Sequence, residues 1–161
     1  MHDFTKDLVF IGQSPSRETD SLPPFAGRDG KDLAALIGKS QDQMLRDHDF
    51  VYLIEKWPGK SICGDRFPMP AAKTRVRELF PHLRGKMVAL IGSKVSKAFG
   101  CEHFAYFRWY QMTDHENPTD VVVARMVVIP DPSYSVRWYG NVDNRDQARK
   151  FLQYITRRVG A

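Results

Sequence analysis

Four apolar runs, each followed by a polar loop, constrain the fold of this chain more than any other feature. They span residues 8–11, 50–54, 87–91 and 121–129, and the first ends at Gly12. Because none of them alternates regularly with polar residues, each predicts a strand buried on both faces, as in a parallel sheet covered by helices. The carboxyl ends of such strands meet at one edge of the sheet, where ligands bind.

Apolar residues at helical spacing separate these runs and continue to the end of the chain. They predict helices over residues 31–38, 40–45, 70–83, 93–99 and 144–159. Strands that alternate with helices predict an α/β fold, a three-layer α/β/α sandwich with a central, mainly parallel four-stranded sheet. The aromatic stretch 104–112 fits either an edge strand or an irregular cover. A length of 161 residues predicts one domain, 1–161.

The composition predicts a globular, cytoplasmic protein with an anionic partner. Hydrophobic residues make up 42% and charged residues 27% of the chain, and no run has the length of a membrane span or the pattern of a signal peptide. The 24 Lys and Arg residues outnumber the 19 Asp and Glu residues, and the resulting net charge of +5 favours a polyanion such as DNA. We expect a monomer without a membrane partner.

The cysteines and histidines give no sign of a metal site. Cys63 and Cys101 lie far apart and neither belongs to a C-x-x-C pair, which indicates neither a disulfide framework nor a metal site. The five histidines show no ligand spacing. We therefore expect no metal and no cofactor.

Three loops carry short motifs: GQSPS begins at Gly12, PFAGRDG begins at Pro24 and DPS begins at Asp131. In this order they resemble the motifs G-x-x-P-G/S, P-F-x-G-x-x-G and x-P-S of the uracil-DNA glycosylase superfamily, and RWYGN from Arg137 is similar to its bacterial and phage members. The resemblance spans nearly the whole chain. It implies a divergent member, without the four cysteines of the iron–sulphur members, that extrudes a base from DNA and hydrolyses its N-glycosidic bond.

The first and last motifs carry the catalytic candidates. Many members of the superfamily place an acidic residue or an asparagine in the first motif to position or activate water, and this chain has Gln13 or Ser14 there, depending on the member compared. Gln13 can orient a water molecule but cannot accept its proton. Ser14 is also a candidate for contact with the base.

Asp131 stands where uracil-specific members have a histidine that stabilises the departing uracil anion. A charged carboxylate would repel that anion. Asp131 therefore acts as a protonated acid, or it serves another step by stabilising a cationic sugar and activating water, or the leaving base differs from uracil. We expect Asp131 to be the main catalytic residue.

Three further residues are candidates for binding the base. Phe25 is expected to stack on it, with ordinary core packing as the alternative. Where uracil-specific members place an asparagine near the end of the second strand, this chain has Tyr52 or Glu55. The carboxylate of Glu55 would accept a hydrogen bond from an exocyclic amine such as cytosine N4 and suits uracil O4 poorly. The alternative is a surface Glu55 paired with Lys56 or Arg66.

We expect five residues to contact DNA: Ser16, Arg28, Ser133, Tyr134 and Arg137. Ser16 and Ser133 lie beside prolines, where hydroxyl and backbone N–H groups can bind phosphates or, alternatively, cap turns. The guanidinium of Arg28 can bind a phosphate. Tyr134 or Arg137 would fill the place in the base stack that the extruded base leaves.

The missing histidine and asparagine favour a base other than uracil. We expect a monofunctional DNA glycosylase that removes a modified pyrimidine, such as the hypermodified or glucosylated hydroxymethylcytosine of phage DNA, and leaves an abasic site, in defence or repair. The alternatives are a uracil-DNA glycosylase in base-excision repair, a non-catalytic DNA-binding relative and an enzyme that acts on free nucleosides.

Overall fold

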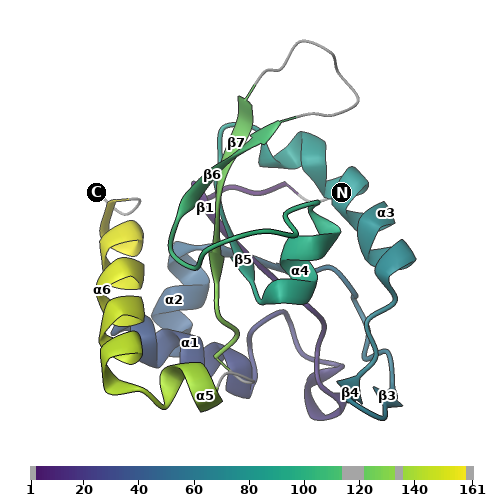
Figure 1. The fold of residues 1–161 in the computed structure, drawn as a ribbon, viewed down its shortest axis with the longest axis horizontal. Helices are drawn as coiled ribbons and strands as arrows, with labels where there is room; N and C mark the ends of the chain where they lie inside the picture. The colour runs from purple at the N-terminus through teal and green to yellow at the C-terminus, as the bar shows by residue number, and fades with distance from the viewer. Residues whose placement is uncertain (1–2, 114–121, 133–135, 159–161) are drawn as a thin grey trace.

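A mainly parallel sheet with helices on both faces forms the centre of the structure (Figure 1). The computed structural model describes residues 3–113, 122–132 and 136–158. No helix in these ranges combines the length and apolarity needed to cross a membrane. The α/β class and the mainly parallel sheet predicted from the sequence are confirmed.

Five strands form the sheet, in the spatial order β2-β1-β5-β7-β6. They are β1 (Leu8–Gly12), β2 (Asp49–Tyr52), β5 (Met87–Ile91), β6 (Trp109–Thr113) and β7 (Val122–Ile129). The first four in spatial order pair in parallel, and β6 pairs antiparallel to β7. The prediction of four strands is therefore wrong, because it omits the antiparallel edge strand.

The additional strand comes from the aromatic stretch 104–112. Trp109 pairs with Val127 at the start of β6, and its ring packs against Phe151 with 6.0 Å between the ring centroids. The guanidinium of Arg125 lies 4.8 Å from the centre of the same ring. The residues just before Trp109 are irregular. The stretch thus contains both an edge strand and an irregular cover.

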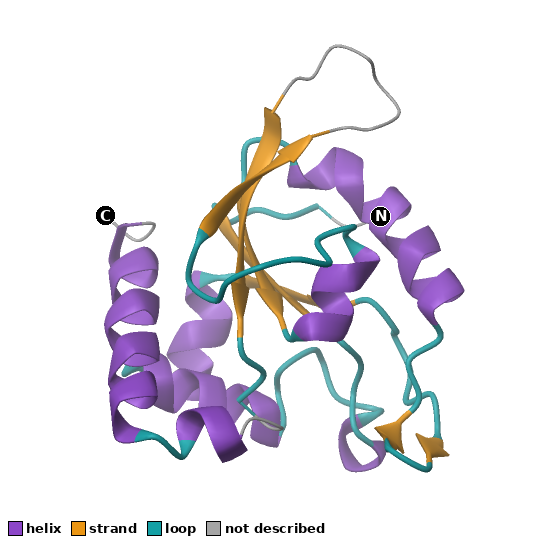
Figure 2. Ribbon diagram, viewed as in Figure 1, coloured by secondary structure: helices purple, strands orange, loops and turns teal. Residues whose placement is uncertain are grey.

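Helices cover both faces of the sheet (Figure 2). One face carries α1 (Arg28–Ile37), α2 (Gln41–Asp47) and α6 (Val142–Arg158), and the other carries α3 (Met69–Leu79) and α4 (Ser93–Ala98). The short elements are η1 (Arg17–Thr19), β3 (Lys60–Ser61), β4 (Gly64–Asp65), η2 (Phe80–Leu83) and α5 (Val136–Tyr139). Both layers of helices place their apolar residues against the sheet.

Strand β1 shows why this arrangement follows from an unbroken apolar run. All five of its residues are buried. Leu8 and Phe10 pack in the cluster under α1 and α6, whereas Val9 and Ile11 pack in the cluster under α3 and α4. Because successive side chains of a strand point to opposite faces, only a run without polar residues can bury both.

Two capping residues, Gly38 and Ser40, lie between α1 and α2. Gly38 ends α1 in the left-handed region, at φ 79°, and its N–H donates to the carbonyl of Ala34. The Ser40 hydroxyl accepts a hydrogen bond of 3.2 Å from the N–H of Gln43 and so caps α2. Together these caps give the tight connection between α1 and α2.

The strand order creates a switch point between β1 and β5. From β1 the chain first adds β2 on one side and then returns to add β5 and β7 on the other. The connections from β1 and β5 therefore leave the sheet in opposite directions, which opens a crevice at their carboxyl ends. These ends lie at the lower edge in Figure 1, together with η1, the β3–β4 hairpin and α5.

His48 lies between α2 and β2 and is only 2% exposed. Its ring meets Phe10 edge-on at 5.8 Å, and neither ring nitrogen has a hydrogen-bond partner among the described residues. Burial first, and the positive charge of Lys39 second, lower the pKa of His48 from 6.5 to about 4. The folded state therefore holds this imidazole neutral down to acidic pH.

We expect His48 to make the protein less stable as the pH falls from 6.5 towards 4. In this window the unfolded state binds a proton at His48 and the folded state does not, so the contribution is complete above pH 6.5 and is lost below it. The loss reaches about 3 kcal/mol, at about 1.4 kcal/mol per pKa unit. Urea unfolding of the wild type and of His48→Met at pH 7 and pH 4 measures it, and equal pH dependence of the two proteins would contradict the prediction.

Candidate active site

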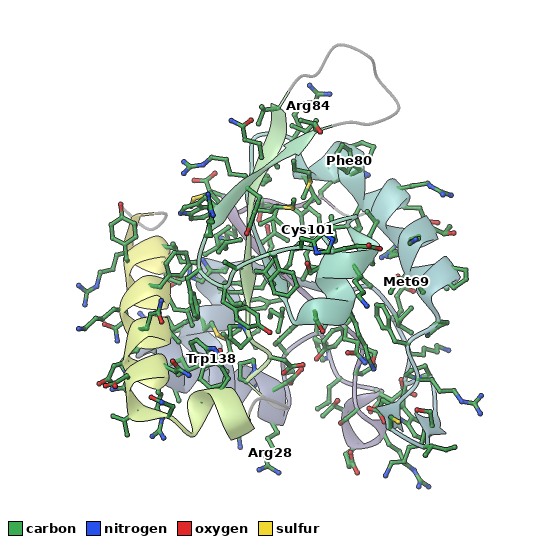
Figure 3. All side chains as sticks on the ribbon, in the orientation of Figure 1. Arg28, Met69, Phe80, Arg84, Cys101 and Trp138 are labelled. Atoms are coloured by element: carbon green, nitrogen blue, oxygen red, sulfur yellow. The ribbon has the colours of Figure 1, made fainter. Side chains whose placement is uncertain are left out.

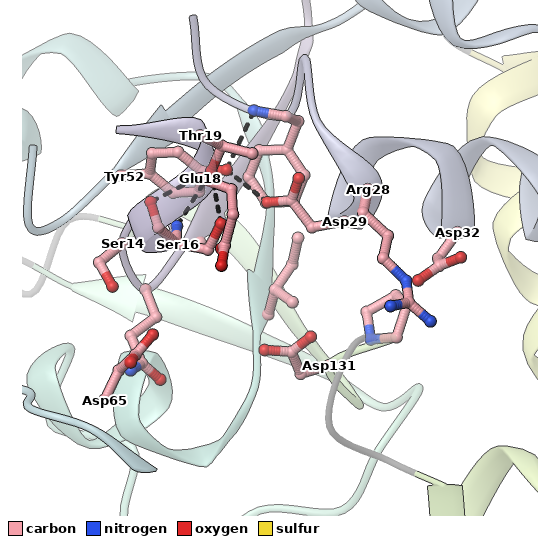
Figure 4. Close-up of a pocket in the computed structure, with 15 residues that line it drawn as sticks. Ser14, Ser16, Glu18, Thr19, Arg28, Asp29, Asp32, Tyr52, Asp65 and Asp131 are labelled. Carbon is pink, nitrogen blue, oxygen red and sulfur yellow. Dashed lines mark hydrogen bonds between the residues drawn. The ribbon is translucent and has the colours of Figure 1, made fainter. Parts of the chain in front are cut away.

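A cavity of about 630 Å³ opens at the carboxyl edge of the sheet, at the switch point between β1 and β5 (Figure 4). Its lining comes from the loop after β1, from η1, from the first turns of α1 and from the ends of β2, β5 and β7. Segments far apart in the sequence therefore converge on one site, as the strand-end motifs predict.

The loop after β1 brings Gln13, Ser14 and Ser16 to this cavity. The carbonyl of Gln13 accepts a hydrogen bond of 3.0 Å from the N–H of Ile54, which ties the loop to the segment after β2. The Ser16 N–H donates to the Thr19 hydroxyl at 3.0 Å, and the two hydroxyl oxygens also lie 3.0 Å apart. Ser16 thus lines the cavity while it also holds η1, which is the capping role considered above.

Asp131 follows β7 and lines both this cavity and a smaller one of about 290 Å³ beside it. Gln13 and Asp65 also line both cavities, so these three side chains lie where the cavities meet. Burial first, and the negative charge of Asp131 second, raise the pKa of the Tyr106 and Tyr139 phenols. These two phenols therefore stay neutral at physiological pH.

Phe25 and Tyr52 form an aromatic side of the cavity. Their ring centroids lie 5.0 Å apart with 30° between the ring planes, and Phe25 is 3% exposed. Most of the Phe25 ring is therefore packed in the core, and little of it is left to meet a ligand. The Tyr52 hydroxyl accepts from the Phe25 N–H at 3.1 Å and donates to Asp29.

The hydroxyl of Tyr52 is therefore already engaged by protein groups. Burial first, then the charge of Asp29, raise the pKa of this phenol well above its usual value. Tyr52 is neutral at every physiological pH, and its hydroxyl fixes the backbone of Phe25, which has a left-handed φ of 61°. The structure gives Tyr52 a role in shaping the cavity.

The structure does not bring Glu55 to the cavity. Its carboxylate forms an ion pair with the Arg75 guanidinium of α3, with 2.7 Å between Arg75 Nη2 and Glu55 Oε1, and the side chain is 67% exposed. The base-reading position predicted for Glu55 is therefore corrected to a surface position. Its partner is Arg75, in place of the expected Lys56 or Arg66, because the chain leaves β2 towards α3.

Among the described residues that line the cavity, five carry carboxylates and one carries a guanidinium. They are Glu18, Asp29, Asp32, Asp65, Asp131 and Arg28. Backbone and Ser16 hydrogen bonds lower the pKa of Glu18, which keeps it ionised. The site is thus rich in hydrogen-bond acceptors although the whole chain has a net charge of +5.

Most of these carboxylates are not predicted as site residues from the sequence, for identifiable reasons. Asp65 reaches the cavity because the β3–β4 hairpin folds back towards the strand ends, and nothing in the local sequence predicts that return. From its sequence position Asp29 fits a helix cap, and in the structure its carboxylate accepts a hydrogen bond of 2.8 Å from the N–H of Gly30. Its position after a strand-end loop is the signal that points to the site.

The DNA-contact candidates are only partly placed. Arg28 lines the cavity at the start of α1 and projects at the lower edge of the molecule (Figure 3). Ser133 and Tyr134 lie outside the described residues, and Arg137 is described only by its backbone in α5. In the same helix Trp138 packs against Phe107, with 5.3 Å between the ring centroids.

No protein-family model matches this chain, and a search of curated proteins found no match. The resemblance to the uracil-DNA glycosylase superfamily therefore rests on the three motifs and on where they lie. Within the described ranges, no group of three or more His, Cys, Asp or Glu side chains is arranged to hold a metal ion.

Proposed function

We propose that this chain is a monofunctional DNA glycosylase that extrudes a modified pyrimidine, hydrolyses its N-glycosidic bond and leaves an abasic site. The observation that carries the proposal is the meeting of Gln13 and Asp131, from the first and last motifs, in one cavity at the carboxyl edge of the sheet. Its volume of about 630 Å³ lies within the usual range of small-molecule sites. The enzyme acts as a cytoplasmic monomer in defence or repair.

In the proposed reaction, the bond between the base nitrogen and C1′ breaks with both electrons going to the base, and a cationic sugar forms. The charged Asp131 carboxylate stabilises that cation, and the amide of Gln13 orients a water molecule. The water oxygen bonds to C1′, its proton passes to Asp131, and the departing base takes up a proton from solvent. Neither residue forms a covalent bond to the sugar.

The acceptor-rich lining supports a base that presents N–H donors. Cytosine offers an exocyclic amine, whereas uracil offers a carbonyl oxygen at the same place, and a carboxylate binds only the former. With Glu55 on the surface, this role falls to the carboxylates of Asp29 and Asp65. The proposed substrates are hydroxymethylcytosine and its glucosylated form, whose hydroxyl groups are further donors.

A panel of duplex oligonucleotides tests this proposal. Each carries uracil, cytosine, 5-hydroxymethylcytosine or its glucosylated form at one position, and abasic product is measured by strand cleavage in alkali. We expect product from one or both modified cytosines and none from cytosine. Product from uracil alone would contradict the modified-base preference, and no product from any duplex would contradict the glycosylase assignment.

A further inference from the structure

The side chain of Ile62 is 104% exposed, the most of any large apolar residue described. It belongs to the two-residue turn between β3 and β4, a position where Asn, Asp and Gly are favoured and β-branched residues are not. Single exposed apolar residues are common on protein surfaces. The meaning of Ile62 therefore depends on how it is held and on what lies beside it.

Other residues of the hairpin close the turn without Ile62. Ser61 Oγ donates to the carbonyl of Gly64 at 3.0 Å and accepts from the Cys63 N–H at 3.3 Å. Gly64 has a φ of 112°, which a glycine adopts without strain. The Ile62 side chain thus neither helps to close the turn nor packs in the core.

The hairpin is fixed against the candidate site. The indole N–H of Trp57 donates to Asp65 at 3.3 Å, and the backbone N–H of Trp57 donates to Asp20 at 2.6 Å, in the loop after η1. Arg17 of η1 lies 5.8 Å from the centre of the Trp57 ring. These contacts set the turn, and with it Ile62, in a defined position relative to η1.

The hairpin also borders the cavities. Asp65 lines both cavities, and Cys63 and Gly64 line the smaller one together with Asp131. Figure 1 shows the hairpin at the same edge of the molecule as η1 and α5. Cationic side chains flank it on a third, more open hollow, which Arg66, Lys94 and Lys97 line. In this arrangement the cavity would hold the extruded nucleotide and the cationic groups would contact its phosphates. The apolar tip, which lies between them, would then meet the base stack.

We propose that Ile62 is the wedge that enters the base stack of duplex DNA and fills the place that the extruded base leaves, an inference that rests on the proposed function. Isoleucine is among the apolar side chains that proteins insert between base steps. The hairpin brings it beside the cavity from an element different from the one that carries Tyr134 and Arg137. In water the apolar surface of Ile62 is exposed and contributes no stabilisation, whereas insertion into the base stack would bury it.

Binding to a stable abasic-site analogue tests the wedge without catalysis. Fluorescence anisotropy measures the Kd of each variant for a duplex with a tetrahydrofuran residue and for the same strand alone. We expect Ile62→Ala to weaken duplex binding about tenfold, because the lost apolar contact is made only in a stack, and to change single-strand binding by less than about twofold. Ile62→Leu should bind the duplex like the wild type.

Val122→Ala is the matched control, because Val122 is 43% exposed and lies at the opposite end of the sheet, at the start of β7. It should leave both affinities unchanged, and none of these variants should lower the unfolding temperature. Equal duplex affinity of Ile62→Ala and the wild type overturns the wedge and leaves the proposed function intact, as does an equal loss on both DNAs. Wild-type protein that binds neither DNA overturns both proposals.

Discussion

Asp131→Asn is expected to slow base release by about 100- to 10,000-fold, the range over which a positioned acid or base contributes to catalysis. The amide keeps the size and shape of the side chain at the meeting of the two cavities, but it neither carries a charge nor accepts a proton. Both proposed roles of Asp131, stabilising the cationic sugar and accepting the proton of the attacking water, are therefore lost. Single-turnover release from the best duplex of the panel measures the effect.

Asp32→Asn separates the role of Asp131 from the general negative charge of the site. Asp32 lies in α1 and also lines the larger cavity, but not the smaller one that Asp131 and Gln13 share. We expect Asp32→Asn to change the rate of base release by less than about tenfold, because it alters only the electrostatic field of the site. Release by Asp131→Asn at the wild-type rate would show that the catalytic role is assigned to the wrong residue.

Gly30→Ala is expected to destabilise the protein by about 3 kcal/mol, at the upper end of the usual cost of overpacking. Alanine inside a helix normally stabilises by about 1 kcal/mol relative to glycine. Here a Cβ on Gly30 would lie 1.7 Å from the carbonyl oxygen of Phe25 and 2.7 Å from Nε2 of Gln41. That amide donates to the carbonyls of Phe25 and Gly27, at 2.8 Å each.

The substituted helix must therefore move away from the loop that carries Phe25. Lys31→Ala is the control, because Lys31 is exposed in the same helix and already has a Cβ. Urea unfolding should show a large fall in the midpoint for Gly30→Ala and little change for Lys31→Ala. A Gly30→Ala protein as stable as the wild type would contradict the close packing of α1 against this loop.

The sequence predicts the layered fold because its strands are unbroken apolar runs. A run such as β1, five residues long and without a polar side chain, fits a strand buried on both faces of a sheet. The edge strand β6 is harder to predict, because its burial is mixed and its side chains are aromatic, so the same residues fit a strand or a cover. Tertiary contacts, such as that of Trp109 with Phe151, decide between the two.

The candidate site is predictable where a residue lies within two positions of the end of a strand. Gln13 and Asp131 are found from the sequence because the ends of β1 and β7 fix where they lie. Glu55 follows β2 by three residues and turns to Arg75 instead, which no local pattern indicates. Asp65 and Ile62 depend on the path of a hairpin and emerge only from the structure.

Base release in water enriched in ¹⁸O tests the central claim most directly. The protein is incubated with the duplex that carries glucosylated 5-hydroxymethylcytosine, and mass spectrometry measures the free base and the abasic strand. Hydrolysis of the N-glycosidic bond by attack at C1′ predicts free modified base without the label and an equal amount of abasic strand. Neither free base nor abasic strand, at enzyme concentrations that saturate the DNA, would contradict the assignment of this cavity as the active site of a glycosylase for that base.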